Sequence, residues 1–574
     1  MPAIVQYKLA GLLGETGLFS VDQIQSLLAE QQQGGKSITE TVTSMGFAPE
    51  ESFLVALAQA MNLPYVKVSD LEIEEQVLDT LPTKVVFQYN VMPVAIENGT
   101  LRVATNDPFT PGMMDALRLA SGKRVQFALA VAPDLANASK TVYGVGADTL
   151  DQMMRDDGID LSEEQPLLKQ DLDELDQDAS IVKFVNQIIW EAQQDRATDI
   201  HLEPMEMDLR IRYRVDGVLH QTPVPPQLKR FQSAIISRIK VMSHMDIAEK
   251  RLPQDGRISL KVRGEDIDVR VSTMPTVYGE SVSLRLLMRN SGLLGLDKLG
   301  LQDQDAEVLN RLIHRPHGIL LVTGPTGSGK STSLYAWLHT INSTDKRILT
   351  LEDPIEYEMP GVNQIHVRPE IGLTFAVGLR HILRQDPDVV MVGEIRDLET
   401  AENAIRAALT GHLVFSTLHT NDAAGAVTRL LDMGIEPFLV ASSVDGLVAQ
   451  RLVRRLCEKC KKPMTIDPEY LERAGFPPEL LSQGTIYEAV GCEECRMTGF
   501  KGRTGIYEII VVDDTIRPLI VTRAASNVIK QQALKQGMRT LRDDGWTKVL
   551  EGITTVEEIL RVSEEDESLA ETSV

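Results

Sequence analysis

The feature that most constrains this sequence is a short apolar segment that runs directly into a glycine-rich loop and then into a helical pattern. The apolar segment covers 319–322, and the helical pattern covers 333–342. Glycines between a buried strand and a helix let backbone N–H groups turn toward phosphate oxygens, and the amino end of the helix adds a favourable dipole. The pattern therefore predicts an α/β fold with a phosphate-binding loop. Its residues are Gly324, Pro325, Thr326, Gly327, Ser328, Gly329, Lys330, Ser331 and Thr332.

Two side chains of this loop suit a nucleotide and its metal ion. The Lys330 ammonium can bind the β- and γ-phosphates, and the Ser331 hydroxyl can ligate Mg²⁺. The expected ligands of this loop are therefore ATP and Mg²⁺.

Two further predicted strands end in carboxylates, which a nucleotide site also needs. Residues 389–393 form an apolar run that leads into Glu394, an acid suited to hold Mg²⁺ through water or to orient an attacking water. Residues 349–351 lead into an acidic turn that contains Glu352 and Glu356. Because ligands of such sheets bind at the carboxyl ends of the strands, either acid could polarise water. Their spacing does not choose between them.

Two histidines, His412 and His419, flank the predicted strand 413–418. Residues seven apart on a strand face opposite sides unless the strand ends between them. A structural role is the commoner one for such a pair. The alternative is that neutral imidazoles near a γ-phosphate sense its loss.

All four cysteines of the chain fall into two Cys-x-x-Cys pairs in turn-rich sequence. Two such pairs separated by 31 residues predict a structural Zn²⁺ site with four thiolate ligands. Redox-active thiols and unrelated free cysteines are the alternatives. The predicted ligands are Cys457, Cys460, Cys492 and Cys495.

Acidic residues exceed basic ones, 82 against 58, which gives a net charge of −24. Duplex nucleic acids bind to basic faces, so we expect no nucleic-acid partner. Much of the excess lies in two stretches: 148–178 holds twelve acids and two bases, and the end from 564 holds five acids and no base. Such stretches predict a solvated linker and a solvated tail.

Other features of the sequence predict a cytoplasmic protein. No apolar run reaches the roughly 18 residues that a membrane span requires, and residues 1–17 lack the pattern of a secretory signal. Four cysteines in 574 residues fit a reducing compartment. Membrane contact is expected only through a partner.

Two α+β domains are expected before the phosphate-binding loop. The first contains a weakly repeated helix pair and short strands, of which the one around Pro93 can only be an edge strand. The second begins with a helix over 181–193 and continues with strands, two of them joined by a hairpin turn at Asp216-Gly217. The predicted boundaries are 1–145, an acidic linker 146–179, 180–295, an ATPase core 296–453, a zinc-binding segment 454–510, a helical subdomain 511–563 and an acidic tail 564–574.

These motifs, in this order, resemble the secretion ATPases that serve as assembly motors of type II secretion systems and type IV pili (the GspE/PilB family). The resemblance covers about 181–562. It includes the phosphate-binding loop, an Asp box at 350–356, a Walker B segment at 388–394 and a His box at 410–421. Further matching segments are 198–204, 212–217 and the cysteine-bearing region that ends at 502–508.

The resemblance implies a RecA-like core preceded by a PAS-like domain, and it implies roles for single residues. Glu356 becomes the carboxylate that activates water, and Glu394 becomes the Walker B acid. His412 and His419 become the His-box residues at the edge that faces a neighbouring subunit. Arg270 and Arg285 become the arginines that the second domain brings to the γ-phosphate.

The implied assembly is a homohexamer that opens and closes around ATP and acts on an inner-membrane platform protein. The cysteine-bearing segment and the long amino-terminal region favour an assembly motor over a pilus-retraction motor. The sequence does not distinguish a type II secretion motor from a type IV pilus motor, since the two share these motifs.

The domain at 1–145 resembles the MshE-like domain of this family, which in some members binds cyclic di-GMP. Here the binding pattern is altered: Lys8 stands for Arg, and Ser37-Ile38-Thr39 stands for Arg-Leu-Gly in the second repeat. Loss of a guanidinium removes bidentate phosphate recognition. Docking to the platform protein is therefore the role expected first, with cyclic di-GMP binding as the alternative.

Two other functions compete with an assembly motor. A nucleic-acid-translocating RecA-like motor is disfavoured by the acidic charge and by the lack of a basic and aromatic stripe. A nucleotide-gated scaffold or cyclic di-GMP-responsive regulator is disfavoured by the presence of Lys330, Glu356 and Glu394 together.

Overall fold

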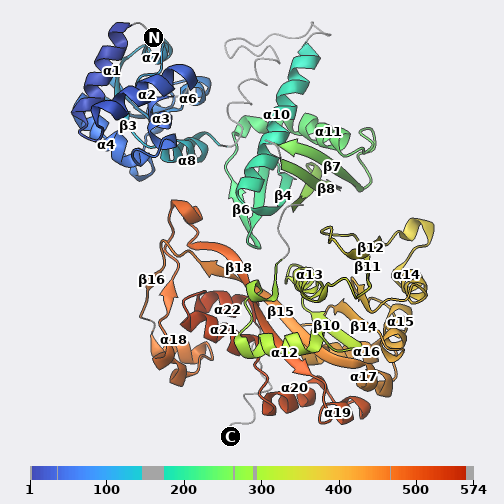
Figure 1. Cartoon of the computed structure of the whole chain (residues 1–574). Helices are drawn as coiled ribbons and strands as arrows, with labels where there is room; N and C mark the ends of the chain where they lie inside the picture. Colours follow the sequence, from blue (N-terminus) through green and yellow to red (C-terminus); the bar gives the residue numbers. More distant parts are fainter. Residues whose placement is uncertain are drawn as a thin grey trace. The chain divides into compact units, whose positions relative to one another are not determined.

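The computed structural model describes residues 3–34, 37–144, 173–262, 265–288, 294–465 and 467–563. The chain divides into two units, Met1–Leu287 and Met288–Val574 (Figure 1). Most of the predicted acidic linker and all of the predicted acidic tail lie outside the described residues. Within the described residues, no helix combines the length and the apolar character needed to cross a membrane.

The amino-terminal part of unit 1 begins with two helix pairs, as the repeat predicted. Each helix contributes buried apolar side chains to one cluster, among them Leu13, Leu27, Val42 and Leu57. The third helix begins with a capping box, in which Ser37 and Glu40 exchange hydrogen bonds with each other's backbone N–H. The four helices are α1 (Ala3–Glu15), α2 (Val21–Gly34), α3 (Ile38–Ser44) and α4 (Glu50–Met61).

A three-stranded sheet follows, with β1 antiparallel and β3 parallel to the central β2. Pro93 lies in β1, an edge strand, as predicted, and the register is irregular between Pro93 and Ala95. This placement suits a residue that has no N–H to donate to a neighbour. The elements are α5 (Glu75–Leu78), α6 (Thr83–Tyr89), β1 (Val91–Glu97), β2 (Thr100–Thr105), α7 (Met113–Ser121), β3 (Arg124–Leu129) and α8 (Ala132–Tyr143).

The second part of unit 1 is a six-stranded sheet in the order β6-β5-β4-β9-β8-β7, with helices α10 and α11. The predicted hairpin is confirmed: Val215 pairs with Val218, and the two turn residues Asp216 and Gly217 have φ of 49° and 87°. The elements are α10 (Asp173–Gln194), β4 (Ala197–Pro204), β5 (Leu209–Val215), β6 (Val218–Thr222), α11 (Gln232–Met242), β7 (Gln254–Val262), β8 (Glu265–Thr276) and β9 (Gly279–Met288).

One boundary in this region differs from the expectation. Helix α10 begins at Asp173, whereas the helical pattern read from the sequence began at Ile181, so residues 173–179 are helical rather than linker. The apolar periodicity by which the helix was recognised starts only where the helix reaches the core, at Ile181 and Phe184.

Unit 2 is built on a seven-stranded sheet in the order β12-β11-β13-β14-β10-β15-β18. All neighbouring strands are parallel except β18, which runs antiparallel to β15. The buried strand–loop–helix pattern predicted such a sheet. The strands are β10 (Gly318–Thr323), β11 (Ile348–Glu352), β12 (Val362–His366), β13 (Val389–Val392), β14 (Leu413–Leu418), β15 (Val444–Leu456) and β18 (Phe500–Val511).

Helices cover both faces of this sheet, because its inner strands β10, β11, β13 and β14 are buried along their whole length. Leu321 packs into one cluster with α14 to α17 and α19 to α22, whereas Leu320 and Val322 pack into another with α12 and α13 (Figure 1). The helices are α12 (Asp303–Ile313), α13 (Lys330–Ile341), α14 (Phe375–Ile382), α15 (Leu398–Leu409), α16 (Ala423–Asp432), α17 (Pro437–Ser443), α19 (Arg517–Val521), α20 (Ser526–Lys535), α21 (Leu541–Leu550) and α22 (Val556–Val562).

The long antiparallel pair β15 and β18 joins this sheet to the cysteine-bearing segment. The predicted boundary between 453 and 454 falls inside β15, and the boundary between 510 and 511 falls inside β18. The segment between these strands holds α18 (Pro468–Arg473) and a two-stranded sheet of β16 (Lys462–Pro463) and β17 (Tyr487–Glu488). The segment is therefore an insertion between two strands of the core sheet.

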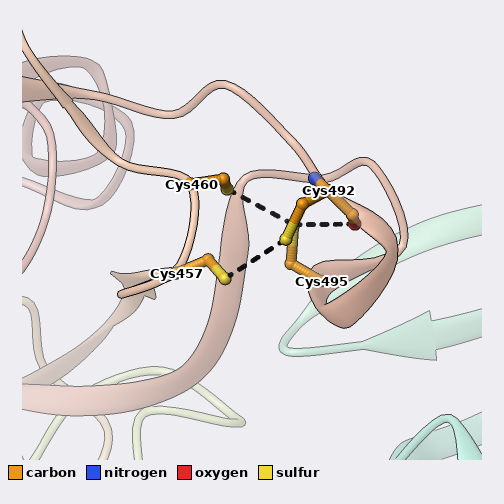
Figure 2. Close-up of side chains that lie close together, drawn as sticks. All are labelled: Cys457, Cys460, Cys492 and Cys495. Atoms are coloured by element: carbon orange, nitrogen blue, oxygen red, sulfur yellow. Dashed lines mark hydrogen bonds between the residues drawn. The ribbon is translucent and has the colours of Figure 1, made fainter. Parts of the chain in front are cut away.

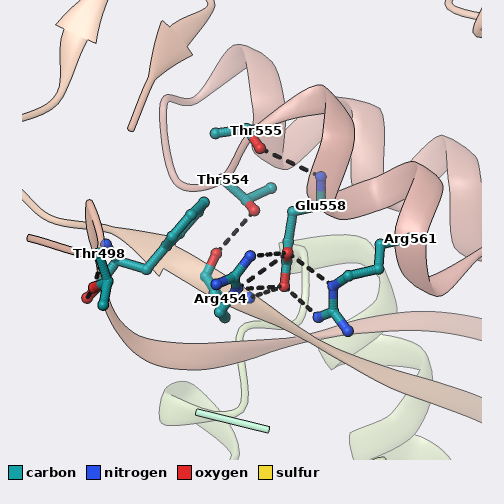
Figure 3. Close-up of polar contacts among 7 residues, drawn as sticks. Arg454, Thr498, Thr554, Thr555, Glu558 and Arg561 are labelled. Atoms are coloured by element: carbon teal, nitrogen blue, oxygen red, sulfur yellow. Dashed lines mark hydrogen bonds and ion pairs between the residues drawn. The ribbon is translucent and has the colours of Figure 1, made fainter. Parts of the chain in front are cut away.

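A buried charge cluster fixes the last helix to β15 (Figure 3). The Glu558 side chain is 1% exposed, and its carboxylate accepts hydrogen bonds from the guanidinium groups of Arg454 and Arg561. Arg454 also lies over the ring of Phe500, 4.0 Å from its centroid. Burial alone would raise the pKa of Glu558, but the two arginines outweigh burial and lower it to about 2.

Candidate functional site: a nucleotide-binding edge

The phosphate-binding loop lies between β10 and α13, as predicted. Three glycines of the loop have positive φ angles that residues with a side chain rarely adopt: 150° at Gly324, 81° at Gly327 and 91° at Gly329. A Cβ on Gly324 would lie 2.6 Å from the Gln450 carbonyl oxygen, and one on Gly329 would lie 2.8 Å from Gln450 Nε2. Conformation therefore requires glycine at all three positions, and space also requires it at Gly324 and Gly329.

The Lys330 ammonium folds over this loop. Its Nζ donates hydrogen bonds to the carbonyl oxygens of Gly324 at 2.8 Å and Pro325 at 3.0 Å. Burial lowers the pKa of Lys330 to about 8, with the nearby Arg451 acting in the same direction and Glu394 opposing it. A nucleotide phosphate beside Lys330 would favour its charged form.

Glu394 follows β13 and lies at the same carboxyl edge of the sheet as the phosphate-binding loop. Its side chain is 15% exposed and pairs with Arg396. On its other side, Glu394 Oε2 lies 3.2 Å from Nε2 of His419, which follows the adjacent strand β14. The structure therefore brings the predicted Walker B acid and one of the two predicted histidines into contact.

The Asp-box acids Glu352 and Glu356 have different surroundings. Glu352 is buried, and its carboxylate accepts hydrogen bonds from the Thr350 hydroxyl at 2.6 Å, Gln364 Nε2 at 3.1 Å and the Tyr335 hydroxyl. The Tyr335 oxygen in turn accepts the Glu356 N–H at 3.3 Å. Glu352 thus fixes the turn through Tyr335, and the turn positions Glu356, whose side chain is partly exposed.

His412 lies far from this edge. Its carbonyl oxygen accepts the N–H of Gly318, the first residue of β10, so His412 is at the amino edge of the sheet. Its Nδ1 lies 2.9 Å from the Ala407 carbonyl oxygen. Since β14 has six residues, about 20 Å separates the two edges, and His412 and His419 do not share a site within the chain.

The two predicted arginines, Arg270 and Arg285, lie on adjacent strands of unit 1, β8 and β9. Arg285 is 57% exposed and donates through Nε to Asp199 Oδ1 at 3.0 Å. Arg210 and Arg212, two other arginines of this sheet, both pair with Glu203. Arg285 is thus held by a carboxylate within its own unit.

Several residues at the nucleotide edge were not predicted from the sequence, among them Gln450, Arg451 and Thr323. Gln450 and Arg451 lie on β15 beside the phosphate-binding loop, and Arg451 donates to the Asn421 carbonyl oxygen at 2.7 Å. Thr323, at the end of β10, contacts Thr420 through the two hydroxyl oxygens at 2.5 Å. No local motif marks these positions. The register of β15 against β10, with Ala449 opposite Thr323, is the signal that places them here.

The four cysteines come together within unit 2, as predicted (Figure 2). Their sulfur atoms all lie within 4.8 Å of one another, and the shortest separations are 3.7 to 3.8 Å. A tetrahedron of thiolates around Zn²⁺ at about 2.3 Å has edges of about 3.8 Å, whereas a disulfide needs about 2.05 Å. The N–H groups of Cys492 and Gly499 donate to Cys495 Sγ. This donor set fits a closed structural zinc site.

Comparisons with known proteins agree with these motifs. Residues 174–561 match the model of the type II/IV secretion system protein family, and residues 61–148 match the MshEN domain. The chain is 41% identical to the type IV pilus assembly ATPase PilB of Myxococcus xanthus (strain DK1622), over 96% of this chain and 98% of that protein. It is 51% identical to the type II secretion system ATPase E of Vibrio cholerae serotype O1, over 75% of this chain and 84% of that protein.

Among solved structures, the pilus retraction motor PilT with bound ADP is 28% identical, with a TM-score of 0.45, over 67% of this chain and 99% of that chain. The family match covers more than half of the chain, and the first of the relatives above matches along almost its whole length. The chain therefore belongs to the family of secretion ATPases that includes the type II secretion ATPase E and the pilus assembly ATPase PilB.

Proposed function

We propose that this protein is a Mg²⁺-dependent, hexameric ATPase motor that drives assembly of pilins or pseudopilins in a type II secretion or type IV pilus system. The observation that carries the proposal is the convergence of Lys330, Glu394, His419 and the Glu356 turn at the carboxyl edge of one parallel sheet. In sheets of this kind ligands bind at that edge.

Within this proposal each residue has a separate task. Lys330 binds the β- and γ-phosphates, and Ser331 ligates Mg²⁺. Glu394 holds the hydrated Mg²⁺ and Glu356 activates the attacking water. Arg270 and Arg285 stabilise charge on the transferring phosphoryl group. His419 acts beside Glu394, and His412, at the opposite edge, acts at a contact between subunits.

The proposed partner is an inner-membrane platform protein, which the motor reaches from the cytoplasm. The zinc site, held by Cys457, Cys460, Cys492 and Cys495, has a structural task. A closed shell of four thiolates leaves no open position for a substrate.

For the amino-terminal domain we propose docking to that platform rather than binding of cyclic di-GMP. At the altered second repeat, Ser37 is engaged in the capping box with Glu40. Thr39 is buried and donates its hydroxyl to the Asn106 carbonyl oxygen at 2.8 Å. Titration of the purified chain with cyclic di-GMP tests this: no saturable heat is expected, and stoichiometric binding would contradict it.

The function is tested in cells by replacing Lys330 with Ala at the native locus and measuring both secreted protein and surface filaments. Loss of exported soluble protein with intact filaments would identify a type II secretion motor. Loss of filaments with intact secretion would identify a pilus-assembly motor. No change in either would contradict the proposal and favour a nucleotide-gated scaffold.

A further inference from the structure

The loop that follows β14, residues 419–423, is anchored from several elements that are distant in the sequence. Thr420 N–H donates to the Thr323 hydroxyl at 2.9 Å, which ties the loop to the end of β10. The Asn421 carbonyl accepts from Arg451 on β15. This loop starts at His419, the residue that contacts Glu394.

A buried ion pair anchors the other end of the loop. Glu508 on β18 is 1% exposed, and its Oε1 accepts the N–H of Ala423, the first residue of α16, at 2.9 Å. Lys530 on α20, also buried, lies 3.4 Å from Glu508 Oε2. The same ammonium lies 3.9 Å from Asp422 Oδ2, so it bridges β18 and the loop.

Removing one partner of a buried ion pair is strongly destabilising, because it leaves an uncompensated charge in the interior. Here the backbone held by the pair leads, four residues earlier, to His419. A shift of the Ala423 N–H away from Glu508 would leave a carboxylate buried with fewer donors. The loop therefore has one favoured position, and that position sets the contact between His419 and Glu394.

We infer that Glu508 and Lys530 are positioning residues for ATP hydrolysis, which fix the loop 419–423 and through it hold His419 against Glu394. This inference rests on the proposed role of Glu394 in hydrolysis.

The same strand supplies a matched control. The N–H of Tyr507, next to Glu508, donates to Asp544 Oδ2 at 2.9 Å, and Asp544 pairs with Lys548 at 3.1 Å. This second pair is also buried, with side chains 0% and 1% exposed. Its hydrogen bond links β18 to α21, its ion pair lies within α21, and neither involves the loop 419–423, so its loss tests general destabilisation alone.

The experiment compares Glu508→Gln with Asp544→Asn in the purified full-length chain. Steady-state hydrolysis of Mg²⁺-ATP is measured at a temperature below both melting transitions. We expect Glu508→Gln to lower kcat at least tenfold while KM for ATP changes less than twofold. Asp544→Asn should leave kcat within twofold of the natural chain. An equal fall of kcat in both variants, or no fall in either, would overturn the inference.

Lys530 gives a second readout that does not depend on Glu508→Gln folding well. Lys530→Arg keeps the cation and should retain kcat within threefold, whereas Lys530→Met should lose at least tenfold. Equal kcat values for the two would count against a positioning role. Glu394→Gln distinguishes failure of the proposed site from failure of this inference. If Glu394→Gln remains active, the proposed site and this inference both fail. If Glu394→Gln is inactive but Glu508→Gln and Lys530→Met remain active, this inference alone fails.

Discussion

The nucleotide-binding edge of unit 2 and its carboxyl-terminal helices use the same kinds of charged side chain in different ways. At the edge, the Lys330 ammonium donates hydrogen bonds to two carbonyl oxygens of its own loop, and His419 beside Glu394 is half exposed. In the helices, Glu558 and Asp544 are fully buried and held by arginines or a lysine. We therefore expect Glu558 and Asp544 to serve the fold, and Lys330 and Glu394 to act on a ligand at the edge.

The largest effect is expected at the edge and should fall on activity. Lys330→Ala removes the cation that binds the phosphates, so ATP hydrolysis should fall at least about 100-fold, or about 2.7 kcal/mol in activation free energy. The melting temperature should change little, since Lys330 bonds only to its own loop in the described contacts. Hydrolysis and thermal unfolding of the purified chain check this, with Lys535→Ala, an exposed position, as the control.

A loss of hydrolysis accompanied by a large fall in melting temperature would instead place Lys330 among the residues that hold the fold. The division between the two regions would then be wrong.

The next effect falls on stability and concerns the cysteine cluster. Cys460→Ser should abolish stoichiometric zinc and lower the melting temperature by roughly 10 °C, because the free energy of metal binding is also folding free energy. Zinc analysis and calorimetry measure both. A chelator should lower the melting temperature of the natural chain but cause no further fall in the variant. An unchanged melting temperature of the natural chain after zinc removal would refute the structural role.

A smaller effect is expected from Glu558→Gln. This change removes the charge that Arg454 and Arg561 share, so the free energy of unfolding should fall by about 2 kcal/mol and the melting temperature by about 5 °C. Below the transition, kcat should remain within twofold of the natural value. A tenfold fall of kcat would mean that Glu558 supports the nucleotide edge as well as the fold.

The smallest effect is the pH dependence of the stability that Glu558 contributes. The pKa of Glu558 is lowered from 4.5 to about 2 in the folded chain. A carboxyl group whose pKa is lower in the folded chain than in the unfolded chain stabilises the fold at pH values above its unfolded pKa. This contribution is lost as the pH falls through the folded pKa. The difference in melting temperature between the natural chain and Glu558→Gln should therefore shrink between pH 5 and about pH 2. A constant difference would contradict the assignment.

Much of the edge could be predicted from the sequence, because local patterns encode it. The phosphate-binding loop, the acid after β13 and the histidine after β14 each follow a recognisable buried strand, and parallel strands bring their carboxyl ends together. The two cysteine pairs likewise carry their own spacing.

What the sequence left open depends on three-dimensional neighbours. Glu352 and Glu356 are alike in the sequence, and only the partners Tyr335, Thr350 and Gln364 show that Glu352 is buried and satisfied. Arg451 and Glu508 reach the loop 419–423 through the register of β15 and β18, which no local pattern reveals.

We propose that the acids and the lysine at the carboxyl edge of this sheet catalyse the hydrolysis of ATP. This proposal is tested most directly by Glu394→Gln in the purified full-length chain, with binding of a fluorescent ATP analogue and single-turnover hydrolysis measured on the same sample. We expect nucleotide affinity to stay within about threefold and hydrolysis to fall at least about 100-fold. Hydrolysis within threefold of the natural chain would contradict the proposal.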